Sequence, residues 1–269
     1  MPESIWRVAA VLFMLSTPVL AQWLNYPTSG VPMNSKGQPD LASPTPKTAD
    51  GKPDLSGMWE PLKNRPCPPE GCPDFQMPQE FTNIGWALKG GLPYQKWAAD
   101  LRKARMVENA KDDPGSHCRP TGIVKQHATA LLKKIIQTPR LLVILNERDS
   151  TFRQIFTDGR PLPSDPDPSW NGYSTGKWVE DTLVVESNGF HDGLWLDRSG
   201  SPMTDAAKIT ERFRRPNYGH LEIELTVDDP KAYTAPWTVK LTQTIVLNTE
   251  FLDYYCLENE KDIVHLVGK

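Results

Sequence analysis

The chain has 269 residues, with 30 lysines and arginines against 33 aspartates and glutamates, so its formal net charge is −3. A slightly negative chain has no general electrostatic attraction to nucleic acid, and we expect no nucleic-acid partner. The length allows one large β domain or two small ones, and nine tryptophans are a high count for it.

The first residues have the pattern of a secretory signal peptide. Arg7 precedes an apolar run over 8–15, and Val19 and Ala21 supply the small residues of a cleavage site. We therefore expect residues 1–21 to be a signal peptide and the protein to be periplasmic or secreted; a buried N-terminal helix is the alternative. No stretch reaches the roughly 20 apolar residues of a membrane span, so none is expected.

An extended arm rich in Pro and Gly is predicted over residues 22–93. The arm repeats GQPDLAS at 37–43 as GKPDLSG at 51–57, and its frequent Pro and Gly residues oppose long regular elements. We expect the arm to lie as a strap over the main body, with Trp59 and Trp86 as anchors.

A helix and then a series of strands are predicted over residues 94–269. Helical spacing relates Tyr94, Trp97, Leu101 and Ala104. From about residue 133 the apolar period changes to two. The expected hairpins are KKIIQT with LLVILNER, GKWV with TLVVESNGF, KITERFRR with LEIELTV, and WTVKLTQTIVL with EFLDYYCLEN, with TFRQIFTDGRPLP as a further strand. The predicted fold is mainly β: an antiparallel meander forming a lipocalin-like barrel or strongly curved sheet, with one N-terminal helix and the Pro-rich strap.

Four cysteines in an exported chain predict two disulfides. Proximity pairs Cys67 with Cys72 and Cys118 with Cys256, although other pairings are possible. The cysteines lack paired C-x-x-C spacing, so no metal site is expected.

Several motifs resemble a family of exported, mostly uncharacterised bacterial proteins: TADGKPDLSGMW, RQIFTDGRPLP, DTLVVES, ITERFRR and DDPKAYTAPWTV. The resemblance covers residues 48–262. Where relatives often have GHPHSEA, this chain has GSPMTDA, so Ser201 and Met203 stand where His is expected and the resemblance implies no His chemistry there. LSGMW, with Gly57 and Trp59, also resembles the opening strand of lipocalin-like barrels.

Glu211 in KITERFRR is the sharpest candidate for chemistry. On a strand it points the same way as Ile209 and Phe213, which places a carboxylate on the inward face. Burial raises the pKa of such a group and prepares it as a general acid or base. The alternative is a buried ion pair, with Arg153 as one possible partner.

Asp158 and His191 are the predicted catalytic partners of Glu211. Asp158 begins an Asp-Gly pair, which is first of all a turn signal. His191 adjoins Asp192, and an imidazole beside a carboxylate is a plausible proton-transfer pair, although a solvated turn is the alternative there.

The predicted ligand-binding residues combine aromatic rings with polar groups. The long loop PLPSDPDPSWNGYSTG is typical of binding loops, and its rings can stack on a flat or sugar-like ligand; a rigid surface loop is the alternative. The predicted set is Arg153, Arg160, Trp170, Tyr173, Trp195 and Gln243.

The sequence leaves three function classes open. No HExxH, P-loop or GxGxxG motif occurs, so no cofactor is expected. The first hypothesis is an exported enzyme of cofactor-independent acid–base type, such as a lyase, isomerase or cyclase, acting on a small molecule. The second is a lipocalin-like binding protein for a hydrophobic or sugar-like ligand, and the third is a structural module with a polar interior.

Overall fold

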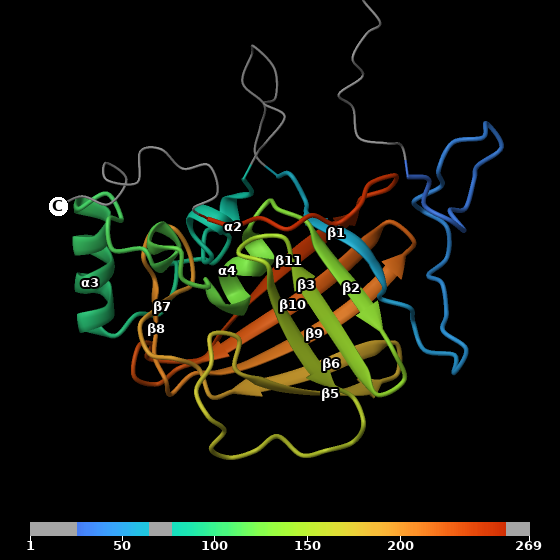
Figure 1. The fold of residues 1–269 in the computed structure, drawn as a ribbon. Helices are drawn as coiled ribbons and strands as arrows, with labels where there is room; N and C mark the ends of the chain where they lie inside the picture. The colour runs from blue at the N-terminus through green and yellow to red at the C-terminus, as the bar shows by residue number, and fades with distance from the viewer. Residues whose placement is uncertain (1–25, 65–76, 257–269) are drawn as a thin grey trace, which may run out of the picture.

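A computed structural model describes residues 26–64 and 77–256. Nine strands form a closed barrel in the order β1-β11-β10-β9-β6-β5-β4-β3-β2, and β2 pairs back with β1 (Figure 1). The predicted mainly β, lipocalin-like barrel is confirmed. The strands are β1 (Gly57–Pro61), β2 (Lys133–Gln137), β3 (Leu141–Asn146), β4 (Thr151–Phe156), β5 (Tyr173–Val179), β6 (Thr182–Asn188), β9 (Lys208–Asn217), β10 (His220–Asp228) and β11 (Trp237–Ile245).

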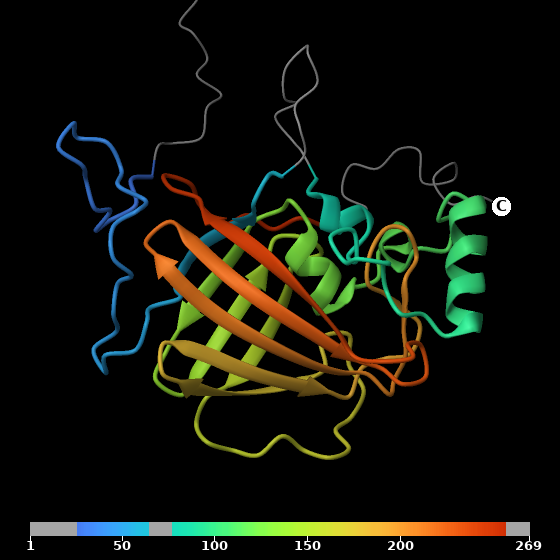
Figure 2. The same ribbon diagram turned by 180° about the vertical axis from the view of Figure 1, so that it is seen from behind.

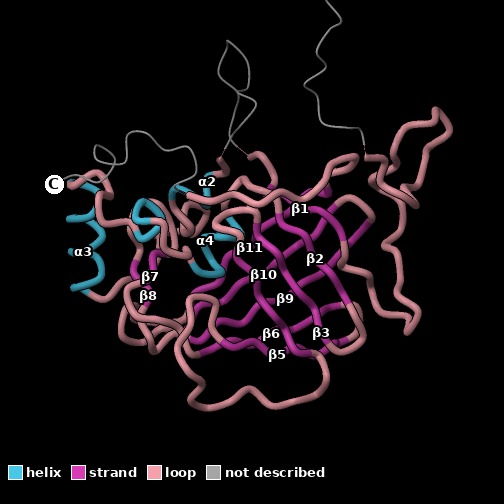
Figure 3. Tube along the Cα trace, viewed as in Figure 1, coloured by secondary structure: helices cyan, strands magenta, loops and turns pink. Residues whose placement is uncertain are grey.

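The helices gather at one end of the barrel (Figure 3). They are α2 (Gln79–Thr82), α3 (Lys96–Val107), α4 (Gly122–Ala128) and the 3₁₀ helix η1 (Pro114–His117). The small sheet of β7 (Leu194–Trp195) and β8 (Pro202–Met203) lies at the same end. The helix predicted from Tyr94 onward is present as α3. Helix α4 is buried over its whole length.

Strand alternation places the core as the sequence predicts. In β9, Ile209, Glu211 and Phe213 are all buried, whereas Arg212 and Arg214 between and beside them are exposed. Seen from behind, β9, β10 and β11 run side by side across the barrel (Figure 2). A closed barrel has one inside, so every inward residue of these strands contributes to a single core.

One strand pair differs from the predicted all-antiparallel meander. β4 and β5 are parallel, and they pair only at Ile155↔Ser174 and Phe156↔Thr175. The loop 157–172 between them runs along the outside of the barrel before β5 begins (Figure 1). Because the loop brings the chain back to the starting end of β4, β5 runs in the same direction as β4. The pairing is short, so the first part of β4 has no β5 residue beside it.

The predicted hairpin of WTVKLTQTIVL with EFLDYYCLEN is wrong. β11 pairs with β10 and with β1, and the described residues after β11 form no strand. β1 comes from the stretch predicted as an extended arm, so part of that arm belongs to the barrel. The reason is that β1 occupies the free edge of β11 and closes the barrel at Trp59↔Ile245. Trp59 is fully buried as an anchor, whereas Trp86 is 43% exposed and is not one.

Cys118 and Cys256 form the predicted disulfide, with their Cα atoms 5.5 Å apart. The predicted signal peptide, Cys67 and Cys72 lie outside the described residues. Within the described parts of the chain, no helix has both the length and the apolar character that a membrane crossing requires.

Candidate functional site

Glu211 lies at the centre of a charged cluster inside the barrel. Its carboxylate has no exposed surface and forms a two-pronged ion pair with Arg153 of β4, whose Nη1 donates to Oε1 at 3.0 Å and whose Nη2 contacts Oε2. From α4, His127 places its Nε2 2.7 Å from Oε1. The ion pair with Arg153 that the sequence offered as the alternative to catalysis is therefore present.

The guanidinium of Arg153 is satisfied by further partners. Its Nε donates to Ser174 Oγ at 3.1 Å, and its Nη2 donates to Ser187 Oγ at 2.9 Å. Both serines are buried, and their hydroxyls lie 2.9 Å apart. Buried charges that keep their hydrogen bonds fix one arrangement of the surrounding strands.

The protonation states in this cluster follow from its geometry. Burial by itself would raise the pKa of Glu211, but the charge of Arg153 and the hydrogen bond from His127 lower it to about 2. The carboxylate is therefore ionised at neutral pH and can only accept hydrogen bonds. Burial lowers the pKa of His127, against the opposing effect of Glu211, so the ring is neutral.

Lys133 is a second buried charge site that the sequence reasoning missed. It comes from β2, is 3% exposed, and places its Nζ 3.5 Å from the carbonyl oxygen of Thr129. Burial lowers the pKa of its ammonium group to about 7, with Glu60 acting in the opposite direction. Strand alternation in the sequence indicates this burial: Lys133 lies on the same inward face of KKIIQT as Ile135, just as Glu211 lies on the same face as Ile209.

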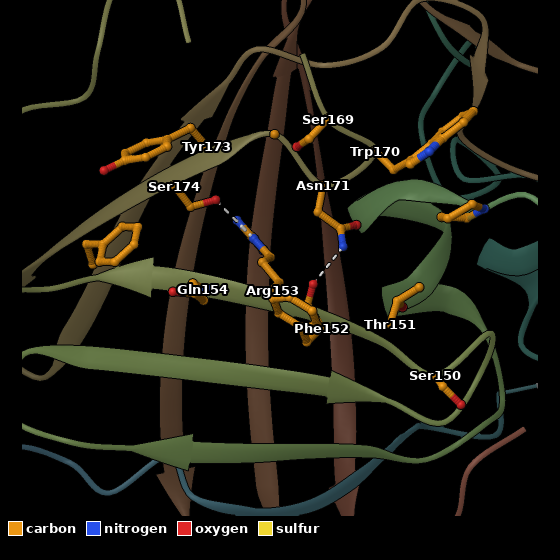
Figure 4. A pocket seen from close by; sticks show the side chains of 13 residues that line it. Ser150, Thr151, Phe152, Arg153, Gln154, Ser169, Trp170, Asn171, Tyr173 and Ser174 are labelled. Atoms are coloured by element: carbon orange, nitrogen blue, oxygen red, sulfur yellow. Dashed lines mark hydrogen bonds between the residues drawn. The ribbon is translucent and has the colours of Figure 1, made fainter. Parts of the chain in front are cut away.

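An aromatic cavity of about 520 Å³ lies where β4 and β5 diverge. Figure 4 shows Arg153 projecting from β4 toward Ser174, with Trp170 and Tyr173 on either side. The lining residues are Pro120, Ser150, Thr151, Phe152, Arg153, Gln154, Phe156, Ser169, Trp170, Asn171, Gly172, Tyr173 and Ser174. The cavity therefore reaches the buried cluster on the side of its guanidinium, whereas Glu211 is not part of its wall.

The rings of the cavity are held by their neighbours. Phe156 and Tyr173 stack with centroids 5.4 Å apart. Arg160 covers Phe156 at 3.9 Å from its centroid and donates to the Tyr173 hydroxyl at 3.1 Å. By contrast, Phe152 is 59% exposed and offers a free aromatic face.

Asn171 contributes a polar group to the same wall. Its Nδ2 donates to the carbonyl oxygen of Phe152 at 3.0 Å, a bond drawn in Figure 4. Its Oδ1 is buried and has no hydrogen-bond partner among the described residues. This oxygen is covered by protein atoms, so a molecule in the cavity does not reach it in this arrangement.

The structure brings together only part of the predicted site. Arg153, Trp170 and Tyr173 line the cavity, and Arg160 lies against two of its rings. His191 is outside the lining but packs on Trp170, with ring centroids 4.9 Å apart.

Three residues of the predicted site lie outside the aromatic cavity. Asp158 forms a salt bridge with Arg160 at 2.7 Å and makes no contact with Glu211. Trp195 is 3% exposed and packs under Arg105. Gln243 points inward as predicted, but its Nε2 donates to the carbonyl oxygen of His127 at 3.0 Å, away from the aromatic cavity.

His127 is the residue of this cluster that the sequence reasoning left without a role. It lies in the last turn of a short buried helix and contacts a partner 84 positions away, so no local pattern connects the two. In the described ranges, no three His, Cys, Asp or Glu side chains are arranged to hold a metal ion.

Comparison with known proteins found no family model that matches the chain and no curated protein that matches it in sequence. The fold and the site therefore define the class: a closed β barrel with an aromatic cavity beside a buried charged cluster.

Proposed function

We propose that the protein is an exported, lipocalin-like binding protein that holds a small ring-shaped molecule in the aromatic cavity between β4 and β5. The observation that carries the proposal is the cavity itself. Its volume of about 520 Å³ is in the range of small-molecule sites, and its wall combines several aromatic rings with a few polar groups. The disulfide between Cys118 and Cys256 supports an oxidising compartment outside the cytoplasm.

The polar groups favour a neutral, hydroxyl-bearing ligand over an anionic one. Arg153 lines the cavity, but its charge is already balanced by Glu211 and only one of its five N–H groups, on Nη1, lacks a described acceptor. That N–H can donate to a ligand oxygen, because Arg153 is part of the cavity wall. A sugar-like ring can stack on the aromatic wall and offer a hydroxyl oxygen to this N–H.

This geometry supports binding better than acid–base catalysis. Glu211 is ionised, fully buried and engaged by two partners, so it has no proton to give and no surface to offer a substrate. Neither Asp158 nor His191 contacts it.

Loss of an aromatic wall residue should abolish ligand retention. Native mass spectrometry of protein taken from the periplasm should show a bound small molecule on the wild type and not on Trp170→Ala. Trp86→Ala is the matched control, because this exposed indole lies outside the cavity. Retention by Trp170→Ala, or loss of the molecule from Trp86→Ala as well, would argue against the site. Conversion of the molecule to a product by the wild type would favour an enzyme.

A further inference from the structure

A second pocket lies directly beside the aromatic cavity. Its volume is about 510 Å³, close to that of the cavity itself. The two pockets have Ser150, Thr151, Phe152 and Gln154 in common, so they meet along β4. A molecule bound in the aromatic cavity therefore has the second pocket as its immediate neighbour.

Strand alternation places the second pocket on the outer face of the barrel. In β4, Arg153 is buried, whereas Phe152 and Gln154 on either side of it are exposed. In β3, the half-buried Val143 and Leu145 lie opposite Gln154 and Phe152. These outward side chains form one surface, and it continues from the wall of the aromatic cavity into the second pocket.

The wall of the second pocket also combines an aromatic ring with polar groups. Phe251, from the segment after β11, adds its ring to the exposed ring of Phe152. Gln154 and Asp253 are exposed in this wall, and neither side chain has a partner among the described residues. The amide of Gln154 can donate and accept hydrogen bonds, and the carboxylate of Asp253 can accept them.

We infer that the ligand is a linear chain of at least two linked sugar-like rings, one in the aromatic cavity and the next in the second pocket. This inference rests on the proposed function, because the first ring occupies the site assigned there. Phe152 contributes to both walls and is 59% exposed, so the ligand can stack on it where it passes from one pocket to the other.

The polar groups favour a chain of hydroxyl-bearing rings over an apolar chain. Hydroxyl groups can pair with the Gln154 amide, which borders both pockets, and with the Asp253 carboxylate in the second. An apolar chain would remove water from these two groups without replacing its hydrogen bonds, which costs free energy.

Isothermal titration calorimetry with saccharides of increasing length tests the inference. The probes are the one-, two- and three-ring members of the glucose, galactose and N-acetylglucosamine series. We expect at least one series to bind, with an affinity about tenfold higher for its two-ring than for its one-ring member, because the second ring adds stacking and hydrogen bonds. Equal affinities for the two members would overturn the inference and leave the proposed function standing. Failure of every series to bind would count against the proposed function, and the inference would fall with it.

Substitutions locate the second ring. Phe251→Ala should remove most of the tenfold gain, because Phe251 lines the second pocket and not the aromatic cavity. Leu252→Ala is the matched control and should keep the gain, because this exposed neighbour lines neither pocket. Thermal melting of each variant establishes that it is folded. A full gain in Phe251→Ala, or an equal loss in Leu252→Ala, would show that the second ring does not lie in this pocket, and the inference would fail.

Discussion

The strand pattern buries Glu211, and its neighbours in the barrel balance its charge. Alternation along β9 directs it inward, and Arg153 on β4 and His127 on α4 then supply the donors that a buried carboxylate needs. A buried ion pair contributes little net stability over a pair of apolar residues, but loss of one partner leaves an uncompensated charge. The role of Glu211 that follows from these contacts is to fix the position of Arg153 beside the aromatic cavity.

Replacement of Glu211 by Gln should therefore destabilise the barrel strongly. We expect a loss of about 3–5 kcal/mol, because Arg153 keeps its charge in the interior without a counter-charge. Glu222→Gln is the matched control: it breaks an exposed pair with Arg214 and should cost less than about 1 kcal/mol. Urea denaturation of the two variants gives both values. Similar losses for both would mean that the interior pair is not a structural charge site.

The pH dependence of stability should reveal the lowered pKa of Lys133 in the folded barrel. Its pKa of about 7 in the folded barrel is below the value of about 10.4 expected when the chain is unfolded. The folded state thus binds fewer protons between these values, so stability should rise as pH increases from 7 to about 10. Lys133→Met should be more stable than the wild type at pH 7 by about 1 kcal/mol or more, and should lack this rise. Denaturation at several pH values measures it; parallel curves for the two proteins would contradict the assignment.

Strand alternation in the sequence predicted the inward direction of Glu211 and Gln243, and the same alternation applied to KKIIQT would have revealed Lys133. It could not predict His127. Periodicity shows which face of an element is buried, but the pairing of His127 with Glu211 depends on where α4 packs against the barrel.

The junction of β4 and β5 shows a related limit in predicting how strands pair from the sequence. A period of two identifies strands without identifying their neighbours. The hairpins of β2 with β3, β5 with β6, and β9 with β10 have short connections and were predicted correctly. Pairings between distant segments could not be found in this way, such as the parallel contact after loop 157–172 and the contacts of β1 with β11 and β2.

Hydrogen exchange should separate this junction from the rest of the barrel. β9 pairs along most of its length with β6 on one side and β10 on the other, whereas the first half of β4 has β3 alone beside it. We expect amides of Thr151–Arg153 to exchange faster than those of Ile209–Phe213, because strands with one neighbour open more easily. Deuterium uptake of the corresponding peptides gives the comparison. Added ligand should slow exchange at β4 if the cavity is the binding site; uniform uptake would contradict the difference.

The disulfide should contribute substantially to the stability of the protein as a unit. Cys118 and Cys256 are 138 positions apart and enclose every strand except β1. By the chain-entropy argument a loop of this length stabilises the fold by about 5 kcal/mol. The double variant Cys118→Ser/Cys256→Ser should lose this amount in urea denaturation, and reduced wild-type protein should match it. Equal stability of the oxidised and reduced proteins would rule this contribution out.

Closure of the barrel by β1 also constrains the order of assembly. β1 is synthesised long before β11, yet its place lies between β11 and β2. A nascent chain that ends before Ile245 lacks the complete β11, with which β1 pairs. The incomplete sheet has open edges, and open edges can associate with other chains. The barrel therefore acquires its protected form only after the whole of β11 has been synthesised.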